Sequence, residues 1–279
     1  MNSKVRRASA TELLVSSIRS SMASPSLWVP ALALLLPTLV FQLAAPTYLR
    51  TRLSPSPWFV LAGSLALVLM AQIVMPAIFA MVHARRTGIA APSLGPTLLV
   101  SARAGVRAFA GLLCGLLPGL WLQARYAFAA FPPGESGADG LRTSATAARG
   151  ATGRLMMCGV AALIASALGQ SLVAVLNDAL AVVRAVGSIE GRTVFQLDYA
   201  SHAATTMVAY VCAVAAATCH AVGVSMIYEE GSAAIGVADD TRLASPTMRP
   251  ATRFAIAASL ALLVAGIAAA AYKIQQHVS

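Results

Sequence analysis

Long apolar runs separated by short polar connections dominate the chain. Four runs are continuous, at 27–49, 57–82, 155–183 and 251–272. Two more carry polar interruptions, at 104–131 and 199–228. Each reaches the ~20 residues that a helix needs to cross the hydrocarbon core. The apolar residues are consecutive, not alternating, so we expect helices and not barrel strands. The predicted fold is all-α, a polytopic membrane bundle of five to six segments.

The polar segments predict surface helices and a linker. Residues 1–26 form an N-terminal tail in which Leu14, Ile18 and Met22 recur every four residues, as in a short helix lying on the membrane surface and ended by Pro25. The stretch "GLRTSATAARG" at 140–150 has a similar weak apolar stripe. The membrane domain is therefore 27–231, followed by a polar linker at 232–250 and a last transmembrane helix with a short tail at 251–279.

Composition and charge agree with this class. The chain is 58% hydrophobic and 11% charged, with mean hydropathy +0.75, far from the usual values for soluble domains. Its formal net charge is +10, but the basic residues lie at the ends of apolar runs. There they set topology and meet anionic lipid headgroups, so we expect no nucleic-acid partner. Eighteen arginines against two lysines suggest a GC-rich, bacterial source and hence a bacterial inner membrane.

The run at 104–131 contains a helix breaker, Pro118–Gly119, and a charge, Arg125. If the run crosses the membrane, eleven basic residues lie on the N-terminal side and eight on the other. If it turns near Pro118–Gly119 and returns, the counts become fourteen and five. The positive-inside rule favours this re-entrant hairpin and a cytoplasmic N-terminus. A kinked helix that crosses is the alternative.

The glycines of the same run have helical spacing. Gly111, Gly115 and Gly119 recur every four residues, a pattern that places a smooth groove along one helix face and allows another helix to approach closely. This spacing predicts helix packing and carries no chemistry.

Ionisable and amide side chains at membrane depth are the candidates for a functional site, because burying them in lipid is costly. We single out Arg125, Asp178, Gln170 and Gln72. Arg125 either stacks on Trp121 or Phe128 and reaches the interface, or pairs with Glu135, Asp178 or a lipid phosphate. Asp178 either lies at headgroup level beside Arg184 or faces inward as a proton or cation site.

Catalytic and metal motifs are missing from the sequence. No nucleophile elbow, phosphate-binding loop, zinc-protease motif or Cys-x-x-Cys pair occurs. The four cysteines lie within apolar runs, where thiols behave as small hydrophobes. His202 and His220 are about 27 Å apart on one helix, too far to share an ion. We therefore expect no enzyme activity, no metal and no cofactor.

The order of several features resembles a family of bacterial multi-pass proteins that includes the membrane domain of some glycerophosphoryl diester phosphodiesterases. The matching pieces are "LLPGLWLQARYAFAAF" at 116–131, Glu135, "GLRTSATAARG" at 140–150 and "VSMIYEEG" at 224–231. The chain departs from the pattern at Thr143, at Ala147 and at Glu229 and Glu230, which stand where a basic residue follows the closing tyrosine. The resemblance implies a membrane module and no phosphodiesterase activity.

Two functions remain open at this level. The first is a non-catalytic membrane module that interacts with anionic lipids, a membrane-protein partner or a second copy of the chain. The second is a small permease or ion-coupled carrier, because interrupted helices often build midplane sites. A carrier needs a polar cavity formed by Arg125, Asp178, Gln170 and Gln72, whereas a module does not.

Overall fold

A computed structural model describes residues 9–52, 57–131, 138–189 and 194–235. These residues form eight α-helices and one short 3-10 helix, with no strand among them, which confirms the all-α class. The elements in chain order are α1 (Ala10–Ala23), η1 (Pro25–Trp28), α2 (Val29–Arg52), α3 (Pro57–Thr87), α4 (Leu94–Leu113), α5 (Leu116–Arg125), α6 (Ala138–Ala147), α7 (Thr152–Ile189) and α8 (Val194–Ile235).

Four helices in the described part of the chain are long and apolar enough to span a membrane. The spans are Pro25–Leu43, Leu61–Thr87, Thr152–Leu176 and His202–Gly231, and they match four of the six predicted runs. The run at 104–131 is not among them, because it is interrupted. The predicted C-terminal helix at 251–272 and most of the predicted linker lie outside the described residues.

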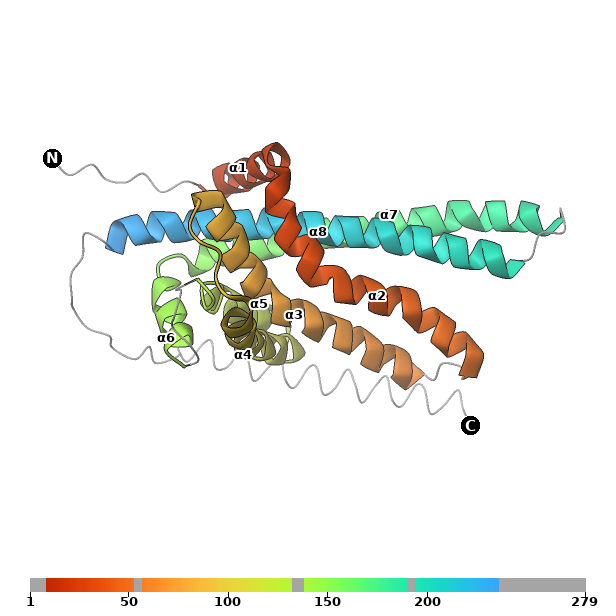
Figure 1. The fold of residues 1–279 in the computed structure, drawn as a ribbon, viewed down its shortest axis with the longest axis horizontal. Helices are drawn as coiled ribbons and strands as arrows, with labels where there is room; N and C mark the ends of the chain where they lie inside the picture. The colour runs from red at the N-terminus through yellow and green to blue at the C-terminus, as the bar shows by residue number, and fades with distance from the viewer. Residues whose placement is uncertain (1–8, 53–56, 132–137, 190–193, 236–279) are drawn as a thin grey trace.

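The molecule divides into a packed end and an apolar end. At one end of the long axis, α1, α4, α5 and α6 gather around α3, α7 and α8, whereas the other end consists of the long helices alone (Figure 1). We call the first end the head; it comprises α1, α4, α5 and α6 with the adjoining parts of α3, α7 and α8. We call the other end, formed by the remaining lengths of α2, α3, α7 and α8, the legs. In the legs, large apolar side chains such as Val40, Leu65, Leu168 and Val211 are exposed. In the head, residues 76–80 of α3 and 220–225 of α8 are buried.

Helix α1 packs on α8 through small side chains. A capping box between Ser9 and Glu12 starts the helix, and it ends before Pro25 as predicted. Ser17 and Ser21 are buried, whereas Ile18 and Met22, from the predicted apolar stripe, are exposed. Small residues at a helix contact let two backbones approach. Leu14, the third residue of the predicted stripe, is half-buried.

The interruption in the run at 104–131 lies at Cys114–Gly115, three residues before the predicted break at Pro118–Gly119. Gly115 has φ 132°, a conformation that side-chain-bearing residues rarely adopt. Pro118 lies in the first turn of α5, where its missing N–H would have no helical partner in any case. The glycine provides the turn, and the proline is compatible with the helix that it begins.

The three spaced glycines do not share one helix face, because the helix ends between the first and the last. Gly111 of α4 instead faces Gly119 of α5: a Cβ added to Gly111 would lie 3.1 Å from the Gly119 Cα. The glycines therefore let the two arms of a helical hairpin touch.

Helix α4 packs on α3 beside a proline that lies inside that helix. Pro76 lies inside α3, and a proline there disturbs the helical bonds of the preceding turn. Ser101 of α4 repairs one of them: its hydroxyl donates to the Ile73 carbonyl at 2.5 Å and accepts from the Ala77 N–H at 2.9 Å. One turn along α4, Gly105 packs directly on the backbone at Gln72, with no room for a side chain.

We predict that Ser101→Ala destabilises the protein by about 1–3 kcal/mol, because it leaves a buried N–H and a buried carbonyl without partners. The measurement is thermal unfolding in detergent. Ser171→Ala is the matched control, since the Ser171 hydroxyl is exposed and bonds only its own helix. Equal melting temperatures for the two variants would contradict this role of Ser101.

Candidate functional site

The structure does not assemble the predicted polar site in the part that it describes. Gln170 is exposed on α7 and Gln72 is half-buried in α3. Arg125, at the end of α5, lies over the Trp121 ring at 5.1 Å from its centroid, which is the stacking alternative. No hydrogen bond or ion pair joins these three side chains. The side chains of Asp178 and Glu135 lie outside the described residues, so the pairing alternative stays a prediction.

A different polar network, which the sequence reasoning missed, connects α8 to its neighbours in the head. Arg86 of α3 binds the Glu229 carboxylate. Arg154 of α7 binds the Glu230 carboxylate at 2.5 Å. Each of the four side chains is partly shielded from solvent, so these contacts are stronger than exposed ion pairs of the same geometry. We call the two pairs the ionic clamp.

The clamp constrains the path of the chain. Glu229 and Glu230 are adjacent on α8, yet their partners lie on opposite sides of the α4–α5–α6 segment in the sequence. The chain therefore leaves this end of α8 after Arg86 and has returned to it by Arg154.

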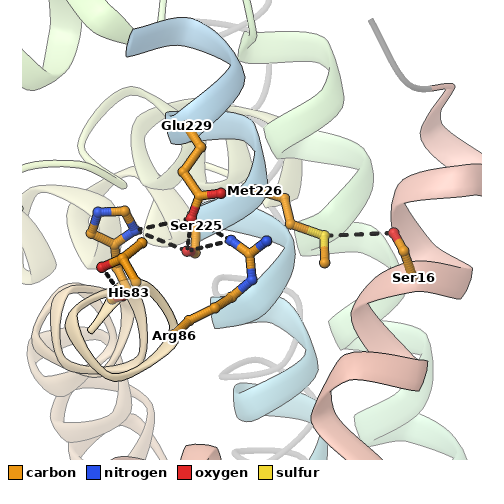
Figure 2. A network of polar contacts seen from close by, with 7 residues as sticks. Ser16, His83, Arg86, Ser225, Met226 and Glu229 are labelled. Atoms are coloured by element: carbon orange, nitrogen blue, oxygen red, sulfur yellow. Dashed lines mark hydrogen bonds and ion pairs between the residues drawn. The ribbon is translucent and has the colours of Figure 1, made fainter. Parts of the chain in front are cut away.

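His83 and Ser225 belong to the same polar network as the Arg86–Glu229 pair of the clamp (Figure 2). The His83 Nδ1 lies 2.9 Å from the Ser225 Oγ and 3.8 Å from the Glu229 carboxylate. Arg86 also donates to the Ser225 hydroxyl at 3.2 Å. Figure 2 shows these side chains converging between α3 and α8, with a separate contact from Ser16 of α1 to the Met226 sulfur at 3.5 Å.

The Ser225, His83 and Glu229 side chains do not form a hydrolytic triad. In a triad the nucleophile and the carboxylate bind opposite nitrogens of the imidazole, so that one orients the ring while the other exchanges a proton. Here both Ser225 and Glu229 approach Nδ1, and Ser225 is fully buried. This arrangement ties α3 and α8 together.

Aromatic rings pack against His83, next to the ionic clamp. His83 contacts Phe131 and Tyr228, with ring centroids 4.7 Å and 5.2 Å apart. Phe128 contacts both of the other aromatic residues. Phe128 and Phe131 come directly after α5, so this cluster attaches the end of the hairpin to α3 and α8. Edge and tilted ring contacts of this kind stabilise the fold by more than the burial of their apolar area alone.

Helix α6 holds the same end of α5 in place. The Ser144 hydroxyl donates to the Arg125 carbonyl at 2.9 Å and accepts from the Phe128 N–H at 3.1 Å. Ser144 thus satisfies backbone groups that the end of α5 leaves free. The predicted surface helix at 140–150 does form, as α6, and it caps the hairpin through this serine.

Comparisons with protein-family models, with curated proteins and with solved structures found no match for this chain. The resemblance to the membrane domain of glycerophosphoryl diester phosphodiesterases therefore stays a prediction. Its closing motif, "VSMIYEEG", contributes the Ser225, Tyr228, Glu229 and Glu230 side chains described above. The two glutamates that depart from the pattern are the residues that form the clamp.

We predict that Glu230→Gln lowers the free energy of unfolding by about 1–3 kcal/mol, because it leaves the shielded Arg154 guanidinium without its counter-ion. Exchanging the charges, with Arg154→Glu and Glu230→Arg together, is expected to recover much of the loss. Thermal unfolding in detergent measures both. Arg142→Gln, at an exposed position on α6, is the control; an equal loss there, or no recovery on exchange, would contradict the clamp.

Proposed function

We propose that this chain is a non-catalytic, multi-pass membrane module that binds membrane lipid. The observation that carries the proposal is the separation of charge from apolar surface. Residues 29–43, 61–82, 155–176 and 202–228 of the four candidate spans contain no Asp, Glu, Lys or Arg, whereas the head holds the Arg86–Glu229 and Arg154–Glu230 pairs. Such a molecule matches a bilayer whose hydrocarbon surrounds the legs and whose headgroups meet the head.

The exposed arginines of the head support the choice of anionic lipid. Arg19 on α1, Arg103 and Arg107 on α4 and Arg142 on α6 are exposed. Arg107 also lies over the Tyr126 ring, 5.7 Å from its centroid. Basic residues near an anionic membrane surface each contribute about 1 kcal/mol of attraction.

The positive-inside rule supports a cytoplasmic head, and with it a cytoplasmic N-terminus and a bacterial inner-membrane location. The ionic clamp supports a hairpin from α4 to α6 that enters the membrane from the side of the head and returns to it. The contact of Gly105 with the backbone at Gln72, inside the candidate span Leu61–Thr87, supports a hairpin that enters the membrane along α3.

A carrier is less well supported. The charged pairs of the head neutralise one another, and the predicted polar residues are not assembled among the residues that the structure describes. A cavity between α1, α7 and α8 has an apolar lining instead, which suits a hydrocarbon chain better than an ion.

The test is the thermal stability of the purified chain with added phospholipid. Phosphatidylglycerol is expected to raise the melting temperature more than phosphatidylcholine, and the difference should shrink with salt because the attraction is electrostatic. In Arg103→Gln with Arg142→Gln, about 2 kcal/mol of the anionic preference should be lost. The matched Arg103→Lys with Arg142→Lys variant should keep it. No rise in melting temperature with either lipid would refute lipid binding.

A further inference from the structure

A cavity of about 300 Å³ lies between α1, α7 and α8. Five alanines and three cysteines of α7 and α8 line most of its wall, and Leu14, Ser17 and Ile18 of α1 complete it. Small side chains in facing positions leave room that larger ones would fill. The cavity therefore arises from the residue sizes along α7 and α8, with α1 covering part of it.

The cavity lies along two of the candidate membrane spans. Its α7 and α8 walls belong to the candidate spans Thr152–Leu176 and His202–Gly231. Along α8 the lining extends from His220, on the side of the head, to Cys212, about 12 Å further into the legs. Near that inner end α7 and α8 touch, since a Cβ added to Gly169 would lie 2.7 Å from the Cys212 Cβ. The length and apolar lining fit the upper part of one hydrocarbon chain, nearest its ester group.

One polar side chain in the wall lacks a partner. His220 is only 6% exposed and packs its ring edge on Phe79, with centroids 4.8 Å apart. Neither of its ring nitrogens has a hydrogen-bond partner among the described residues. A neutral imidazole carries one N–H donor, and at an apolar cavity wall this donor gains from an acceptor on a ligand. A ligand with an acceptor at this level would satisfy it.

We propose that this cavity holds one acyl chain of a membrane phospholipid and that His220 donates a hydrogen bond to its ester carbonyl. The inference rests on the proposed lipid-binding function and names the site. The chain runs from His220 toward Cys212, so the headgroup lies on the side of the head. Arg19, which is exposed and follows the lining residue Ile18 on α1, supplies a cation for the lipid phosphate.

The experiment uses the full chain in nanodiscs that contain phosphatidylglycerol with a photoactivatable diazirine on one acyl chain. Cross-linked peptides are located by mass spectrometry, and adducts are expected on the α7 and α8 peptides that line the cavity. Ala216→Phe places a large ring in the cavity and should reduce these adducts at least fivefold. Ala167→Phe is the matched control, because Ala167 is exposed on α7 outside the cavity, and it should leave them unchanged.

The hydrogen bond is tested separately. His220→Gln keeps a donor and should retain most of the adducts, whereas His220→Leu should lose about three- to tenfold, as expected for one hydrogen bond. The reactivity of the native cysteines tests the site without any substitution. Phosphatidylglycerol should slow the reaction of Cys219 with N-ethylmaleimide, while Cys114, which is partly exposed and outside the cavity, serves as the reference.

The outcomes separate the two proposals. Equal adduct yields in wild type and Ala216→Phe, or equal slowing at Cys219 and Cys114, would overturn the acyl-chain site. If phospholipid still raises the melting temperature in that case, lipid binding stands and the lipid lies elsewhere on the molecule. If no phospholipid raises the melting temperature, both the site and the proposed function fail.

Discussion

Two adjacent carboxylates on α8 bind arginines of two other helices and so hold α3 and α7 against α8. Glu229 binds Arg86 at the end of α3, and Glu230 binds Arg154 at the start of α7. Removing one member of a shielded pair leaves a charge without compensation, so such pairs hold their helices in one register. Because Arg86 precedes α4 and Arg154 follows α6, the segment from α4 to α6 begins and ends near the same end of α8.

Within that constraint, serine side chains replace the backbone bonds that the helix interruptions remove. Ser101 bonds the backbone on both sides of Pro76, and Ser144 satisfies the groups at the end of α5. At membrane depth an unpaired backbone group has no water to bind, so irregular backbone persists only where a neighbour covers it. The head is thus a set of interrupted helices that cover one another, and the legs are longer helices with exposed apolar side chains.

Features that depend on apolar length are predictable from the sequence, whereas features that depend on side-chain pairing are not. Runs of ~20 apolar residues locate the four spans, and Pro25 and the stripe at 140–150 locate the end of α1 and the position of α6. The break near Pro118 is displaced to Gly115 because a proline fits the first turn of a helix, whereas φ 132° needs glycine. The clamp could not be predicted, since nothing local shows which arginines face Glu229 and Glu230.

The most direct test is the sidedness of two glycines that flank the hairpin. Gly95 and Gly150 are exposed, and a Cβ at either position meets nothing within 4 Å, so cysteine is tolerated at both. In a background without the native cysteines, a membrane-impermeant maleimide should label both positions from the same side, and should label Gly191→Cys, in the connection between α7 and α8, from the other. Labelling of positions 95 and 150 from opposite sides would contradict the account.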